Sequence, residues 1–120
     1  MRDATTLETT TVGRKTPGDG KLEIRRDTAE RLRALGTPVT FRLVRRGAAA
    51  RLASGTVTAM PCTCAKGAAA GAHEHHFLES PVLRELAVGT TVAVTLGTTG
   101  DVELRISGAG PSPERPRAPA

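Results

Sequence analysis

The sequence predicts a small, mainly β domain that closes as a six-stranded barrel, with one or two short helices and disordered termini. Three observations predict this fold. Apolar and polar residues alternate in six short segments, Gly-containing turns separate several of them, and large apolar side chains are few. Closure into a barrel would remove the exposed sheet edges that so many short strands create.

The first half of the expected domain reads as strand, short helix, strand and strand. Residues 21–26 alternate between apolar and polar side chains and predict the first strand. Asp27 and Glu30 have the spacing of a capping box at the start of a helix. Two further strands are predicted at residues 39–43 and 52–60.

The second half repeats this order. A short strand begins at Phe77, a helical turn follows Ser80, and strands are predicted at residues 92–96 and 102–106 around a turn at residues 97–100. Because both halves read as strand, helix, strand and strand, we expect a two-fold repeat within one chain.

The alignment of the halves requires a shift of 53 residues. This shift places Asp27 on Ser80 and Gly36 on Gly89. The repeat is similar to that of the swapped-hairpin barrels of AbrB-type DNA-binding proteins, which pair two chains. Here one chain carries both halves.

The domain is expected to occupy residues 20–107. Residues 1–19 are rich in Thr and Gly and show no apolar period, and residues 108–120 are rich in Pro, so both ends are predicted to be disordered. Hydrophobic residues make up 38% of the chain and the only aromatic residues are two Phe, so the core has little stability in reserve. A bound metal would add to it.

No segment of the sequence has the length and apolarity of a membrane span, and the N-terminus lacks the apolar stretch of a signal peptide. We therefore expect a cytoplasmic protein that does not bind membranes. Thiols stay reduced in that compartment, which favours metal ligation over a disulfide.

All the cysteines and histidines of the chain lie within fifteen residues of one another. Chance would rarely concentrate every metal-binding side chain of these two types in one segment. We therefore predict a metal-binding hairpin over residues 60–77. Its candidate ligands are Cys62, Cys64, His73, His75 and His76.

The spacing of these residues predicts how they converge. In an extended chain, positions i and i+2 point to the same face, so Cys62 and Cys64 form one pair and His73 and His75 another. The Gly/Ala-rich run between the pairs allows the chain to reverse. Two thiolates and two imidazoles are the tetrahedral set that zinc prefers. His76 would point to the opposite face, and could replace His75 or join it.

The metal is predicted to be Zn²⁺, with Cu⁺ as the alternative because Met60 adds a soft thioether nearby. Neither the zinc deaminase pattern nor the zincin pattern is present, although Glu74 or Glu79 could act as a base. We therefore predict a non-enzymatic zinc-binding module with a regulatory or protein-interaction role. One alternative is a nucleotide-binding or nucleic-acid-binding module that uses the basic half of the chain, and another is a metal enzyme or copper carrier.

Charge is unevenly distributed along the chain. Residues 21–51 contain nine Lys or Arg and three Asp or Glu, whereas residues 52–107 contain three and five. A basic half is typical of nucleic-acid binding or phosphorylated-ligand binding, although arginine can also be simply the preferred surface cation. The candidate phosphate contacts are Arg25, Arg26, Arg31, Arg42, Arg45 and Arg46.

Three strand segments, Pro-Val-Thr-Phe-Arg-Leu, Ser-Gly-Thr-Val-Thr-Ala and His-Phe-Leu-Glu-Ser, resemble those of PilZ-type barrels over about residues 37–106. The resemblance implies a small β-barrel, and in that family it implies cyclic-di-GMP binding through Arg-x-x-x-Arg and Asp/Asn-x-Ser-x-x-Gly. Both motifs depart here. The one Arg-x-x-x-Arg, from Arg42 to Arg46, lies in or just after the strand, and residues 59–64 replace the second motif.

Overall fold

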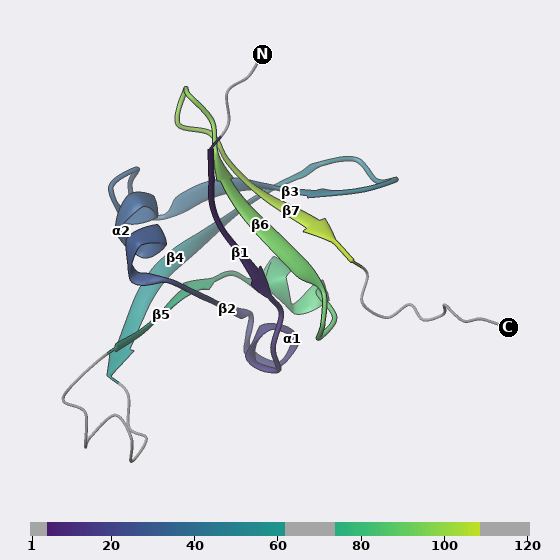
Figure 1. The fold of residues 1–120 in the computed structure, drawn as a ribbon, viewed down its shortest axis with the longest axis horizontal. Helices are drawn as coiled ribbons and strands as arrows, with labels where there is room; N and C mark the ends of the chain where they lie inside the picture. The colour runs from purple at the N-terminus through teal and green to yellow at the C-terminus, as the bar shows by residue number, and fades with distance from the viewer. Residues whose placement is uncertain (1–4, 62–73, 109–120) are drawn as a thin grey trace, which may run out of the picture.

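The computed structural model describes residues 5–61 and 74–108. Figure 1 shows their helices and strands, which surround a common core. In chain order they are β1 (Thr5–Thr11), α1 (Lys15–Asp19), β2 (Lys21–Ile24), α2 (Arg26–Arg33), β3 (Val39–Arg45), β4 (Arg51–Pro61), β5 (Glu74–Glu79), the 3-10 helix η1 (Pro81–Glu85), β6 (Thr91–Leu96) and β7 (Val102–Ser107).

The strands form one nearly closed, barrel-like sheet in the order β1-β6-β7-β3-β4-β5-β2. Most neighbours are antiparallel, but β3 and β7 run parallel, with Phe41 opposite Val102 and Leu43 opposite Leu104. This parallel pair joins the two halves of the chain. The prediction of a mainly β, barrel-like fold is confirmed.

Alternation along the central strands produces the core as predicted. Val39, Phe41 and Leu43 of β3 are each at most 3% exposed, and the residues between them face outward. On β6, Val92 and Val94 are fully buried in the same cluster. Every second side chain of these strands therefore points into the barrel, because successive side chains of a strand point to opposite faces.

The number of strands is the main correction to the predicted fold. Six strands were expected and the sheet has seven, because residues predicted to be disordered form β1 along β6. A strict two-fold repeat would require β6 to pair with β4, as β3 pairs with β7. In the structure β1 takes that place, so the repeat holds for the order of elements but not for their pairing.

The ordered N-terminal segment has a clear physical basis. Threonine favours strands, and Leu7 and Val12 pack on the core, Val12 being 1% exposed. The register of β1 shifts between Thr6 and Glu8, a β-bulge that interrupts the alternation. Leu7 is the one apolar residue of β1, so the segment shows no apolar period although it forms a strand, and the ordered domain starts before residue 20.

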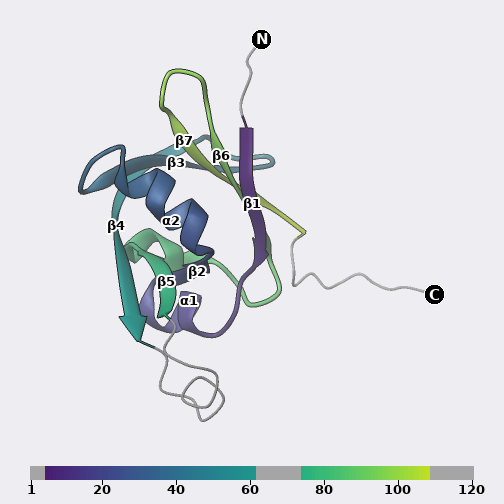
Figure 2. The same ribbon diagram turned by 60° about the vertical axis from the view of Figure 1, so that its left-hand side comes forward.

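Helix α2 is the predicted first helix, but it begins differently. Its N-cap is Arg25, with no side-chain hydrogen bond, so the capping box from Asp27 to Glu30 does not form. Ala29 and Leu32 are completely buried and anchor the helix to the core. In the view of Figure 2, α2 lies between β1 and β4.

Phe77 on the outer face of β5 lies beneath lysine side chains of α1 and β2. Phe77 is 1% exposed although it lies outside the main core cluster. The ammonium nitrogens of Lys15 and Lys21 lie 5.4 and 5.7 Å from the centre of its ring. These contacts are cation–π interactions, and they show that α1 and β2 together bury this aromatic side chain.

Candidate metal-hairpin base and adjoining pocket

Strands β4 and β5 bring together the two ends of the predicted metal-binding segment. They pair antiparallel, with Met60 opposite His75 and Pro61 opposite Glu74. The chain that leaves β4 thus returns beside it, as the predicted reversal requires. Three candidate ligands, Cys62, Cys64 and His73, lie outside the described residues.

The two described histidines lie on opposite faces of β5, as strand alternation predicts. His76 is opposite Ile24 of β2, on the inner face, and its side chain is 9% exposed. The side chain of His75 is 41% exposed and belongs to the outer face. One metal ion on one face would therefore be reached by only one of them.

His75 contacts a carboxylate from a neighbouring strand. Its Nδ1 lies 2.7 Å from Oε2 of Glu23. Glu23 is directly opposite Phe77, two residues along from His75 on the same face, so the contact is a diagonal cross-strand pair. A carboxylate only accepts hydrogen bonds, so Nδ1 is the donor in this contact, and in the neutral ring the lone pair is then on Nε2. This tautomer is the one suited to ligating a metal through Nε2.

His76 has different surroundings. Its Nε2 lies 3.9 Å from Oε1 of Glu74, and its Nδ1 is buried without a hydrogen-bond partner in the described part of the chain. A buried ring nitrogen without a partner is costly to stability. His76 therefore lines the interior end of the barrel rather than the outer surface where His75 lies.

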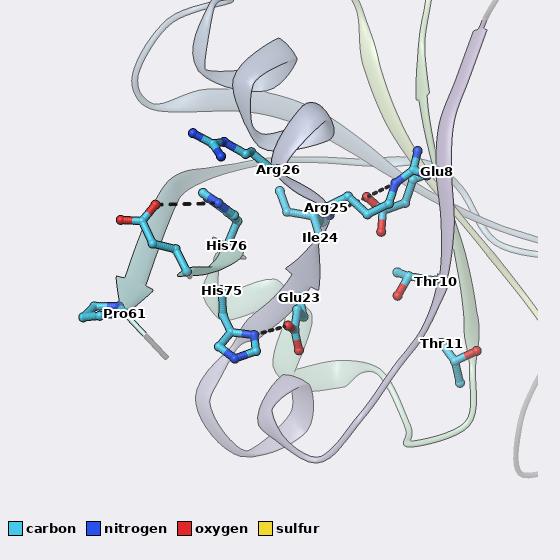
Figure 3. Close-up of a pocket in the computed structure, with 11 residues that line it drawn as sticks. Glu8, Thr10, Thr11, Glu23, Ile24, Arg25, Arg26, Pro61, His75 and His76 are labelled. Atoms are coloured by element: carbon cyan, nitrogen blue, oxygen red, sulfur yellow. Dashed lines mark hydrogen bonds and ion pairs between the residues drawn. The ribbon is translucent and has the colours of Figure 1, made fainter. Parts of the chain in front are cut away.

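A pocket of about 940 Å³ adjoins both histidines (Figure 3). It lies at the seam where β1 and β2, the two end strands of the sheet, approach without forming a ladder. Its size is typical of small-molecule sites. The lining residues are Glu8, Thr10, Thr11, Glu23, Ile24, Arg25, Arg26, Pro61, Glu74, His75 and His76.

Arg25, which directly follows β2, contacts β1 at one end of this seam. Its backbone N–H donates to Oε1 of Glu8 at 2.8 Å, and its Nη2 donates to the carbonyl oxygen of Leu7 at 2.8 Å. The Glu8 side chain is only 7% exposed, so the backbone N–H of Arg25, with its Nε 3.9 Å from Oε1, provides a partner for a nearly buried carboxylate. Figure 3 shows this contact at one side of the pocket, with Thr10 and Thr11 farther along β1.

The six predicted arginine contacts do not gather in one place. Arg25 and Arg26 line the seam pocket, whereas Arg45 and Arg46 line a second pocket beside β7. Arg31 lies on α2 and Arg42 on the exposed face of β3, and neither lines these pockets.

Sequence reasoning missed Glu23, Glu8 and Arg105. Glu23 was noted only as a polar position in an alternating strand, and its pairing with His75 depends on the β2–β5 register. Glu8 lies in the segment predicted to be disordered. Arg105 lies in the mildly acidic half but lines the same pocket as Arg45. No local sequence signal relates Glu23 to His75, Glu8 to Arg25, or Arg105 to the pocket that Arg45 lines.

Two structural findings limit what the described residues can do alone. Within residues 5–61 and 74–108, no group of three or more His, Cys, Asp or Glu side chains is arranged to hold a metal ion. Of the helices that the structure describes, none is long and apolar enough to cross a membrane.

Comparisons with known proteins returned nothing: no family model matches the chain, and no curated protein or solved structure matches it.

Proposed function

We propose that this protein is a zinc-binding, barrel-like module in which Cys62, Cys64, His73 and His75 hold one zinc ion. The ion would fix the hairpin beside the seam pocket, and the module would serve a regulatory or protein-interaction role. The observation that carries the proposal is the contact between His75 and Glu23. A ligating histidine usually donates its other ring N–H to a carboxylate, which sets both the tautomer and the ring orientation.

The β4–β5 register supports the choice of ligands. Residues directly opposite one another in an antiparallel pair share a face, so Met60 and His75 share the outer face. Two residues beyond Met60 comes Cys62, and two residues before His75 comes His73. We propose that these two residues lie on the same face as Met60 and His75. His76 is left out because it belongs to the inner face.

The donor chemistry favours zinc. Two thiolates with two imidazoles form a closed tetrahedral set, which is typical of structural rather than catalytic zinc. Copper(I) is the second candidate, because the Met60 side chain is 44% exposed and lies opposite His75. A thioether beside thiolates selects soft ions.

Metal analysis of protein purified without a histidine tag tests the proposal. We expect about one zinc per chain, which is lost in the double variant Cys62→Ser/Cys64→Ser. His75→Ala should weaken zinc binding strongly, whereas His76→Ala should keep the zinc. Zinc should also raise the thermal midpoint of the wild-type protein, because an ion that binds only the folded chain stabilises it.

Three results would contradict this assignment. Unchanged zinc content in the double cysteine variant would exclude the thiols as ligands. Equal loss of zinc in the two histidine variants would contradict the assignment by face, provided circular dichroism shows that both variants fold. One equivalent of copper in place of zinc would favour the copper carrier.

A further inference from the structure

A second pocket, of about 900 Å³, lies beside the ends of the parallel strands β3 and β7. The loop after η1 and the middle of β6 form the rest of its wall. Apart from Val44, Arg45 and Arg46 at the end of β3, its lining comes from the second half of the chain. The pocket shares no lining residue with the seam pocket beside His75.

Arg45 occupies a core-facing position in this pocket. Along β3 the buried side chains are Val39, Phe41 and Leu43, and the next position of the same face is Arg45. The series that fills the barrel thus ends in a guanidinium group. Its Nη2 is buried and has no hydrogen-bond partner among the residues that the structure describes. A buried charged donor without an acceptor is costly, so an acceptor from a ligand would stabilise it.

The other charges around the pocket leave an excess of positive charge. The Glu85 carboxylate is bonded to Arg51 and also interacts with the charge of Arg45, and Glu103 accepts a hydrogen bond from Nε of Arg105 at 3.2 Å. Arg46 also lines the pocket, with its side chain exposed. Among the lining residues, Arg45, Arg46 and Arg105 are cationic and Glu85 is anionic, a formal excess of two positive charges.

The remaining wall of the pocket is apolar. Leu86 is 2% exposed, and Val44 and Ile106 lie on the adjoining ends of the parallel strands. Beside a guanidinium, such a wall suits a molecule with an anionic head and a short apolar body. Arginine binds the planar oxygen pairs of carboxylates and phosphates in a bidentate manner.

We propose that this pocket binds a small organic oxyanion, a carboxylate or phosphate on an apolar body, with Arg45 as the residue that holds its head group. This site is independent of the proposed zinc site. The zinc content of the protein should therefore not depend on Arg45.

Isothermal titration with hexanoate, hexyl phosphate, hexanol and inorganic phosphate tests the proposal. We expect hexanoate or hexyl phosphate to bind. Hexanol and inorganic phosphate should each bind at least about tenfold more weakly, because hexanol lacks the anionic head group and inorganic phosphate lacks the apolar body. The hexyl anion that binds more tightly identifies whether the pocket prefers a carboxylate or a phosphate head group. Arg45→Gln should weaken binding at least about tenfold, since it removes a charge-assisted hydrogen bond.

Arg33→Gln is the matched control, because it removes the same charge from an exposed position of α2, outside the pocket. It should leave binding of the hexyl anions unchanged. Arg45→Lys keeps the charge without the planar fork and should recover only part of the affinity. Three results would overturn the proposal: no binding of either anion, equal binding of hexanol, or undiminished binding by a folded Arg45→Gln variant.

Discussion

Glu23 and His75 are 52 residues apart in sequence, yet Oε2 of Glu23 lies 2.7 Å from Nδ1 of His75. The contact exists because β2 and β5 pair with Lys21 opposite Glu79 and Glu23 opposite Phe77. The first strand of the predicted domain thus supplies a carboxylate to the strand that contains the last two histidines of the cluster. In the proposed zinc site, this carboxylate orients the ligand without touching the ion.

Replacing Glu23 by Gln is therefore expected to weaken zinc binding by about 10–100-fold while leaving all the proposed ligands in place. The amide no longer fixes the Nδ1–H tautomer of His75 by charge, so the preference for ligation through Nε2 is lost. Competition with a chromophoric zinc chelator would measure the change in affinity.

Glu30→Gln provides the comparison for that experiment. Glu30 is 59% exposed on α2, where it pairs with Arg26 and does not line the seam pocket. It should leave the zinc affinity unchanged. Equal affinities for the Glu23 and Glu30 variants would mean that the Glu23–His75 contact plays no part in metal binding.

Much of the fold followed from local sequence signals. The alternation that ends in Leu43 predicted β3, and Ser80 followed by Pro81 predicted η1, because these signals act between neighbouring residues. β1 was missed because Leu7 is its one apolar residue, which leaves no apolar period in the sequence. Its stability comes from pairing with β6, which is a non-local contact.

The candidate site was predictable only in part. The spacing of His75 and His76 indicates opposite faces on a strand, and the structure places them so. Spacing could not reveal which face is the outer one, because that depends on the core packing of Leu22 and Leu78. Nor could it reveal Glu23 as a partner, since that requires the sheet register.

The order of β1 can be tested at Val12, which is 1% exposed and packs in the core. Val12→Ala should lower the free energy of unfolding by about 1–3 kcal/mol, because it leaves a cavity. Val88 is 54% exposed, so Val88→Ala should change it by less than about 0.5 kcal/mol. Urea unfolding would measure both, and equal small effects would contradict a structural role for residues 5–12.

The seam contact of Arg25 should also contribute to stability. Arg25→Met keeps most of the side-chain stem but removes the hydrogen bond to Leu7 and the charge beside the nearly buried Glu8. We expect a loss of about 1–2 kcal/mol in urea unfolding. Arg26→Met breaks only an exposed pair with Glu30 and should cost less than about 0.5 kcal/mol. Faster amide exchange in β1 of the Arg25 variant would locate the effect at the seam.

Glu85 should make stability depend on acid pH. The hydrogen bond from Arg51 lowers the pKa of Glu85, with burial opposing the shift and the charges of Arg51 and Arg45 adding to it. A carboxyl group with a lowered pKa in the folded state stabilises the fold above its unfolded pKa, and this stabilisation is lost as pH falls through the folded pKa.

Glu85→Gln should therefore flatten the fall of the thermal midpoint below the ordinary glutamate pKa, while the midpoint at neutral pH drops slightly. Both side chains of the pair are about half exposed, so the effect should be small and should shrink in salt. Arg51→Gln, and the double variant, should show the same flattened profile. An unchanged acid profile in all three variants would exclude the pair as its source.

Gly55 of β4 allows a close approach between β4 and the end of β5. A Cβ atom at this position would lie 2.6 Å from the carbonyl oxygen of Glu79, far inside normal contact. Gly55→Ala should therefore push the two strands apart and cost about 1–3 kcal/mol in unfolding free energy. A Cβ at Gly13 would have no atom within 4 Å, so Gly13→Ala should be nearly neutral or slightly stabilising.

Because β4 and β5 carry the two ends of the proposed zinc hairpin, the Gly55 variant should also bind zinc more weakly. A Gly55 variant as stable as Gly13→Ala would contradict the close approach of the two strands.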